Sequence, residues 1–183
     1  MLVKVSAASM RQEFAGCSPD YIRDVCHASC CRSSIAATGI IVTIHPTEQA
    51  AIKAVGGVVV NGLLQPADGC RRCPFQSTET HLCGLHDTPA KPFGCIASPF
   101  TLTRNGHTLI VRNRYRLLKC YRDGDRIPAY IAFRASLDLI FGRDVAQDIS
   151  DHMDAGGGDM VANITDDTYD VLVDNDAIKK RAT

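Results

Sequence analysis

The chain has 183 residues, of which 45% are hydrophobic, and it balances 20 Lys+Arg against 20 Asp+Glu. This length suggests one domain, or one domain with a tail, and the hydrophobic fraction excludes a wholly disordered chain. There is no run of ~18 apolar residues, which excludes a membrane-spanning helix. The segment MLVKVSAASMRQEF lacks the apolar core of a signal peptide, so we expect a cytoplasmic protein with reduced cysteines.

The balanced charge hides a strong asymmetry along the chain. Residues 1–143 hold 17 Lys+Arg against 10 Asp+Glu, whereas residues 144–183 hold 3 against 10, giving +7 and −7. We therefore expect a basic body over 1–143 and an acidic tail over 144–183, with a flexible linker around DAGGGD. The tail is a ready intramolecular partner for the basic surface of the body.

Several secondary-structure elements are predicted in chain order. Ser18-Pro19-Asp20 is typical of a helix start, and the short helix EQAAIKAV should end at Gly56-Gly57. Further patterns predict strands in IAATGIIVTI, VVVNGLL and HTLIVRNRYRLL, a helix over Ile127–Phe141, and a short strand or docking segment in TYDVLV.

Residues 65–100 change character. They contain four Cys, two His and five Pro, and show neither helical nor strand periodicity. A loop this long without regular structure is uncommon in a compact domain. Metal ligation is the obvious means of holding it.

The nine cysteines fall mainly into two clusters. An odd number excludes complete intramolecular disulfide pairing, and a Cys-rich cytosolic chain is more often metal-binding or redox-active than disulfide-bonded. Thiolates bind Zn²⁺ and iron–sulfur clusters strongly, because sulfur is a soft donor. The candidate metal ligands are Cys26, Cys30, Cys31, Cys70, Cys73, Cys83 and Cys95, with His27 as a further candidate. The isolated Cys17 and Cys120 are better explained as small core residues.

The second cluster resembles the CxxCxxCC cysteine-cluster family, which is described as zinc- or iron-chelating. The resemblance rests on Cys73-Pro74-Phe75-Gln76, on Cys83-Gly84-Leu85-His86, and on Lys91-Pro92-Phe93-Gly94-Cys95 followed by Pro99. In the family these segments read CPFL, C-x-I-Y and RP-x-x-C. The resemblance covers roughly residues 20–100. It implies that the metal ligands are Cys30, Cys31, Cys73, Cys83 and Cys95, with Cys26 or Cys70 completing the set.

The first motif departs from the family pattern. The family would have Cys at positions 24 and 27, where this chain has Asp24 and His27. Either His27 replaces a thiolate or the local turn brings in Cys26. A histidine ligand would favour zinc or mononuclear iron over an all-cysteine cluster.

A basic stretch follows the cysteine-rich loop. In a strand, Arg112, Arg114 and Arg116 would share one face, and further basic residues continue to Arg126. Such a surface could bind an anion, either an anionic macromolecule such as a nucleic acid or the chain's own acidic tail.

Together these features predict an α+β fold: a small, irregular, metal-stapled domain with short helices, a few strands and a long Cys-rich loop. The first hypothesis is a metal-binding protein coordinating zinc or an iron–sulfur cluster, including a 4Fe-4S cluster. The alternatives are an iron- or cluster-dependent enzyme modifying a protein or nucleic acid held by the basic patch, and a non-catalytic metal-stabilised binding module. No nucleotide-binding loop, nucleophile elbow or H-E-x-x-H motif is present.

Overall fold

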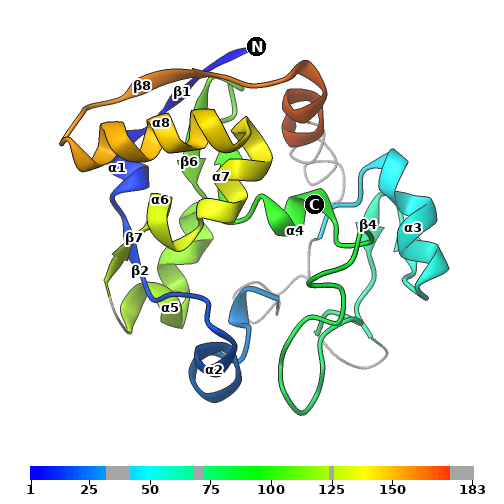
Figure 1. Ribbon diagram of the computed structural model, residues 1–183. Helices are drawn as coiled ribbons and strands as arrows, with labels where there is room; N and C mark the ends of the chain where they lie inside the picture. The colour runs from blue at the N-terminus through cyan, green and yellow to red at the C-terminus, as the bar shows by residue number, and fades with distance from the viewer. Residues whose placement is uncertain (32–41, 68–71, 124–125, 174–183) are drawn as a thin grey trace.

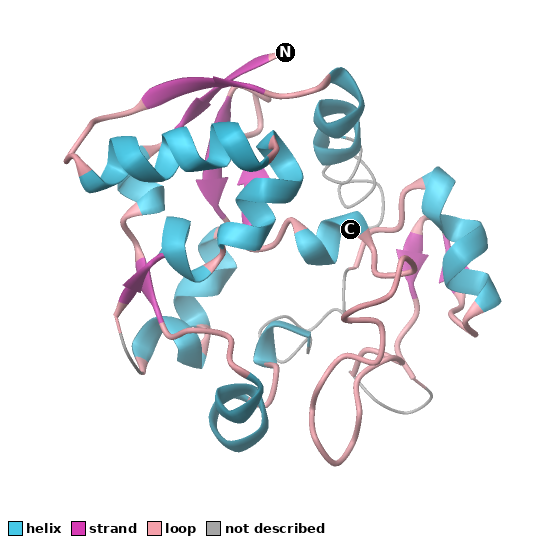
Figure 2. Ribbon diagram, in the orientation of Figure 1, coloured by secondary structure: helices cyan, strands magenta, loops and turns pink. Residues whose placement is uncertain are grey.

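A computed structural model describes residues 1–31, 42–67, 72–123 and 126–173. It has an α+β fold built around two unequal hydrophobic cores (Figure 1). The larger core lies beside the main sheet, and the smaller one lies near α3 and β4, on the other side of α4 in this view. Figure 2 shows how few of the connections between them are helical or extended.

The main sheet has four strands in the order β5-β6-β1-β8. Their bounds are Phe100–Leu102, Thr108–Val111, Leu2–Val5 and Met160–Asn163. β1 runs parallel to β6 and antiparallel to β8, while β5 pairs with β6 antiparallel. Along β1, Val3 and Val5 are buried whereas Leu2 and Lys4 are exposed, as expected for a strand with one face on a core.

Helices α7 (Arg134–Phe141) and α8 (Arg143–Asp154) pack against each other beside the sheet (Figure 1). Leu137 and Ile149, one from each helix, are completely buried in the larger core. Ser136 connects this core to the cysteine-rich loop, because its hydroxyl lies 2.7 Å from the carbonyl of Ile96 and 2.9 Å from that of Ser98.

The smaller core gathers Ile44, Ile52, Leu64, Cys73, Leu85 and Ala90. Its regular elements are the 3-10 helix η3 (Pro46–Glu48), the helix α3 (Gln49–Ala54) and the hairpin formed by β3 (Val59–Val60) and β4 (Leu63–Leu64). Six residues of helix and a two-residue hairpin are too little to fold alone. Their stability must come from the loops that pack on them.

The remaining elements are short. They are α1 (Ala7–Met10), β2 (Glu13–Phe14), α2 (Pro19–Tyr21), the π-helical turn η1 (Ile22–Cys26), η2 (Ser29–Cys31), α4 (Phe93–Ile96), η4 (Asn113–Leu117), α5 (Lys119–Arg122), β7 (Ile127–Pro128) and α6 (Ala129–Ala132). β2 and β7 pair antiparallel in a separate two-stranded sheet.

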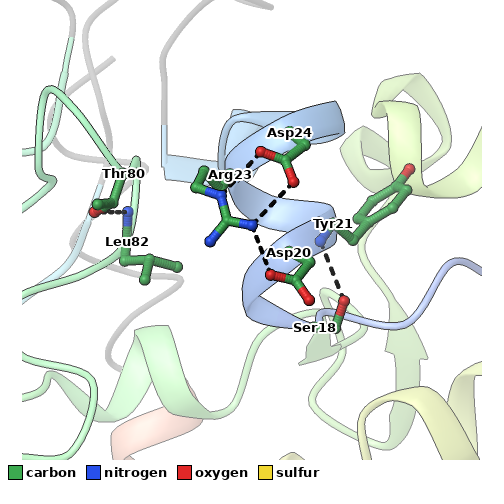
Figure 3. Close-up of polar contacts among 7 residues, drawn as sticks. All are labelled: Ser18, Asp20, Tyr21, Arg23, Asp24, Thr80 and Leu82. Atoms are coloured by element: carbon green, nitrogen blue, oxygen red, sulfur yellow. Dashed lines mark hydrogen bonds and ion pairs between the residues drawn. The ribbon is translucent and has the colours of Figure 1, made fainter.

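Two local predictions are confirmed. Ser18 caps a helix, its hydroxyl accepting a hydrogen bond from the Tyr21 N–H at 3.1 Å (Figure 3). The second helix ends before Gly56, which has a φ of +86°. VVVNGLL, predicted as one strand, instead forms a hairpin whose turn residues Asn61 and Gly62 both have positive φ, as a tight two-residue turn requires. Most of IAATGIIVTI lies outside the described residues.

The single helix expected over Ile127–Phe141 is wrong. Ile127 and Pro128 pair with β2, and the helical residues that follow are divided between α6 and α7 at Phe133, where φ is −121° and ψ is 35°. The Phe133 ring makes edge contacts with the rings of Phe14 and Phe100, at centroid distances of 5.2 and 6.3 Å. Aromatic packing in the core therefore overrides local helix propensity here.

The strand predicted over HTLIVRNRYRLL is only half right. β6 ends at Val111, and residues 113–117 form the 3-10 helix η4. Successive residues in a 3-10 helix are rotated by about 120°, so Arg114 and Arg116 do not share the face that a period-two strand would give them. Tyr115 is buried between them.

The predicted linker also differs from the structure. α8 covers residues 143–154, and β8 joins the main sheet beside β1. Asp159 accepts a hydrogen bond from the Ala7 N–H at 2.9 Å, which places the DAGGGD segment against the body. TYDVLV is helical over residues 168–173 rather than extended. Among the described residues, no helix is both long and apolar enough to span a membrane.

A substitution at Gly57 can test how tightly the smaller core is packed. A Cβ at this position would lie 2.6 Å from Cγ2 of Ile52 and 2.9 Å from the Phe75 ring. We expect Gly57→Ala to lower the free energy of unfolding by about 1–3 kcal/mol, as overpacking does. Urea denaturation would measure this loss. Gly158→Ala is the control, because nothing lies within 4 Å of its Cβ, and it should change stability by less than ~0.5 kcal/mol. Equal effects would contradict the packing argument.

Candidate metal centre

The first cysteine cluster lies on a sharply reversed stretch of backbone. η1 ends at Cys26, and both His27 and Ala28 then adopt left-handed conformations with φ of 51° and 46°. Two consecutive non-glycine residues in this region cost roughly 1–2 kcal/mol each. The reversal leads directly into η2, so Cys26 and the Cys30-Cys31 pair lie on opposite arms of one tight turn.

Cys30 and Cys31 interact through their sulfurs, which are 4.0 Å apart. The hydrogen bond with Cys31 and, to a lesser extent, the charge of Arg114 outweigh the opposing effect of burial and lower the pKa of the Cys30 thiol to about 7. The same bond raises the pKa of Cys31 well above its usual range. Cys30 is therefore the more readily ionised thiol of this pair.

The second cluster is carried by an irregular hairpin. The Gln76 N–H donates to the Cys73 carbonyl at 3.0 Å, and the Gly84 N–H donates to the Phe75 carbonyl at 2.8 Å. Gln76 and Cys83 form an isolated antiparallel bridge. These bonds bring Cys73 and Cys83 together although nine residues separate them.

Three thiols from two separate segments lie at the smaller core, and electrostatic effects associate Cys95 of α4 with two of them. Cys73 belongs to that core, and Cys31 and Cys83 pack against it. Burial, together with the smaller effects of Cys73 and Cys83, raises the pKa of Cys95 to about 12. Besides its bond to Cys30, Cys31 is affected in the same direction by Cys95 and Cys73. Among the described residues, however, no three His, Cys, Asp or Glu side chains are already arranged as a metal-ion site.

The backbone and one lysine favour ionised sulfur at this location. The pKa of Cys73 is raised by burial but lowered by the N–H of Phe75, which hydrogen-bonds its sulfur. Lys91 lowers the pKa of Cys95 and also contacts His86, with 2.8 Å between Nζ and Nδ1. A bound cation would act in the same direction as these groups.

Gln76 holds the two cysteine clusters together, and the sequence analysis did not identify it as important. Its side chain is only 5% exposed, and its Nε2 donates to the carbonyls of His27 at 3.1 Å and His81 at 3.2 Å. The rings of these two histidines lie 4.6 Å apart, centroid to centroid. The sequence feature that could have identified Gln76 is its position as a polar residue directly after the apolar Pro74-Phe75 pair.

Glu48 is a second connecting residue that the sequence analysis did not single out. One carboxylate oxygen accepts from the His45 N–H at 2.9 Å, and the other accepts from the Phe93 N–H at 2.5 Å. It thus connects the start of the helical stretch in the smaller core to the start of α4, which carries Cys95. An acidic side chain near a helix N-terminus is also favoured by the helix dipole.

The other predicted site residues are placed as follows. Cys70 lies outside the described residues. Arg112 follows β6 and is partly buried, whereas Arg114 and Arg116 are exposed on η4. Asp159 and Asp166 from the predicted tail form ion pairs with Lys4 and the amino terminus, at the β1–β8 edge of the sheet. Anion binding by the arginines stays a prediction.

Comparison with known proteins gave no match: no family model, no curated protein and no solved structure is similar to this chain.

Removing the Gln76 amide should loosen the two cysteine segments. We expect Gln76→Met to lower the free energy of unfolding by about 1–2 kcal/mol, because it removes two hydrogen bonds with little change in volume. Urea denaturation of the reduced protein would measure this. Gln65→Met is the matched control, because Gln65 donates only to the Leu63 carbonyl two residues away, at 3.1 Å. If both variants lose the same stability, the connecting role of Gln76 is wrong.

Proposed function

We propose that this protein binds a thiophilic metal, either zinc or an iron–sulfur cluster, through Cys31, Cys73, Cys83 and Cys95. The observation that carries the proposal is that Cys31 of η2 and Cys73 and Cys83 of the 73–83 hairpin lie at one small core. Cys95 of α4 is added to this set because, after burial, Cys73 and Cys83 raise the pKa of its thiol.

The chemistry of the donor set fits such a metal. Four sulfurs with no oxygen ligand suit zinc or an iron–sulfur cluster and do not suit magnesium or calcium. Without a cation these thiols are hard to ionise: the hydrogen bond with Cys30 raises the pKa of Cys31, burial raises the pKa of Cys73 and Cys95, and neighbouring thiols add a smaller effect in the same direction. A metal would reverse this penalty by stabilising the thiolates.

The proposed role is structural. Four protein thiolates fill a tetrahedral zinc ion, which leaves no open position for a substrate or water. The segments that supply them have almost no backbone ladder of their own, so a metal would connect η2, the hairpin and α4. Gln76 and Glu48 would then position the ligands, because each spans two of the segments that carry them.

Metal analysis of anaerobically purified protein tests the proposal. We expect stoichiometric zinc in a colourless protein, or iron and sulfide in a brown protein absorbing near ~400 nm. Stripping the metal under reducing conditions should lower the unfolding temperature by at least ~10 °C, because binding free energy becomes folding free energy.

Cys83→Ser and Cys95→Ser should each lose this metal. Thr78→Ala, at an exposed position of the same hairpin, is the control and should retain it. A protein that takes up neither zinc nor iron after anaerobic reconstitution, yet unfolds cooperatively at an unchanged temperature, would contradict the proposal.

A further inference from the structure

A cavity lies where α1, β2 and α5 meet, on the side of the molecule away from α3 and β4 (Figure 1). It has a volume of about 520 Å³, which is within the range of ~300–1,000 Å³ that small-molecule sites usually occupy. Its polar lining residues are Arg11, Gln12, Glu13, Tyr121, Arg122 and Arg126. None of them is a ligand in the metal site proposed above, so a function of this cavity does not depend on that site.

Backbone hydrogen bonds hold the two walls of the cavity together. β2 pairs with β7, and the Ala129 N–H just after β7 donates to the Gln12 carbonyl at 2.8 Å. The Ala15 N–H donates to the Cys120 carbonyl at 2.6 Å, which places α5 beside the end of β2. These bonds bring arginines from two stretches that are far apart in the sequence to one cavity.

The cavity carries more positive than negative charge, because three arginines and one glutamate line it. Arg126 and Glu13 form an exposed ion pair with 3.3 Å between Nη1 and Oε2. An exposed pair of this kind contributes little to stability and is easily rearranged by a stronger anion. No hydrogen bond or ion pair joins the Arg122 guanidinium to another residue that the structure describes. Its N–H donors are therefore available to a ligand.

Arg11 is held in place by groups that leave its charge uncompensated. Its Nη2 donates to the carbonyl of Met153 at 3.2 Å and to that of Gly157 at 2.5 Å, at the end of α8. Both bonds use one nitrogen, which leaves N–H groups on the other two nitrogens for a ligand. A guanidinium fixed in this way is suited to bind an anion, because little side-chain freedom remains to be lost.

Gln12 and Tyr121 add recognition beyond charge. Gln12 Oε1 is buried and accepts no hydrogen bond from the part of the chain that the structure describes. A buried acceptor without a donor is unfavourable, and a ligand hydroxyl would satisfy it once the amide rotates toward the cavity. The Tyr121 ring makes an edge contact with Phe14 at a centroid distance of 5.4 Å, which fixes one wall of the cavity.

We propose that this cavity binds a small phosphate monoester that also carries hydroxyl groups, such as a sugar phosphate. Arginine matches phosphate oxygens with paired, charge-assisted hydrogen bonds, which assigns the phosphate group to Arg11, Arg122 and Arg126. A hydroxyl of the same molecule donates to Gln12. A bare inorganic anion would use the arginines and leave the rest of the cavity unfilled.

Isothermal titration calorimetry of the full chain tests this proposal, with ribose 5-phosphate, inorganic phosphate and ribose as probes. Ribose 5-phosphate should bind at one site per chain, about 10-fold more tightly than inorganic phosphate, and ribose should not bind. Arg122→Ala should weaken the binding of ribose 5-phosphate by about 10-fold or more, as the loss of a charge-assisted hydrogen bond does. Gln12→Leu should reduce the preference for ribose 5-phosphate over inorganic phosphate.

Arg104→Ala is the matched control, because Arg104 is exposed between β5 and β6 and does not line the cavity. It should change the affinity by less than about twofold, and all three variants should keep the unfolding temperature of the unaltered chain. Equal losses of affinity in Arg104→Ala and Arg122→Ala would overturn the proposal, because net charge alone would then explain the binding. The proposal is also overturned if ribose 5-phosphate does not bind at ~1 mM in low salt, or binds no more tightly than inorganic phosphate or ribose.

Discussion

The constraint on which this structure depends is a lack of backbone pairing in the region that joins its two cores. Between β4 and β5, the described residues contain one four-residue helix and isolated bridge residues, but no strand of two or more residues. Backbone polar groups in such a region must be satisfied by turns and side chains, since no ladder is available. The Gln76 amide satisfies the carbonyls of His27 and His81, and the Glu48 carboxylate satisfies the N–H groups of His45 and Phe93. Each of these side chains therefore connects two separate segments, and cysteines lie in or close to the connected segments.

This arrangement explains why the cysteines bridge the two cores. Cys31, Cys73 and Cys83 pack on the smaller core, whereas Cys120 belongs to the larger one. The Cys30-Cys31 pair lies between them, with its sulfurs 4.0 Å apart. A metal held by the thiols at the smaller core would therefore stabilise the segments that pack on that core. The smaller core needs such stabilisation more than the larger one, because a six-residue helix and a short hairpin cannot bury enough surface alone.

The parts of the fold that could be predicted from sequence are those set by local chemistry. Ser18 before a proline and Gly56 after a helix each act within a few residues. The Asn61-Gly62 turn is also local, but it lies inside a stretch that was predicted as one strand. The errors arose where distant contacts decided the outcome. Phe133 breaks a helix because it packs between rings from β2 and β5, and η4 follows β6 because Tyr115 turns inward. Of the two isolated cysteines predicted to be core residues, Cys120 lies in the larger core whereas Cys17 is exposed.

The basic residues that lie near the thiols have a second physical explanation besides binding an anionic partner. A tetrahedral zinc held by four thiolates carries a net charge of about −2, which a partly buried site must offset nearby. Arg114 already lowers the pKa of Cys30, after the effect of Cys31, and Lys91 lowers those of Cys17 and Cys95. Lys119 lies next to Cys120 and binds the carbonyl before Cys26. If the proposed metal binds, these cations would offset the charge of its thiolate ligands, which is an explanation for the basic sequence at this location beside that of an anionic partner.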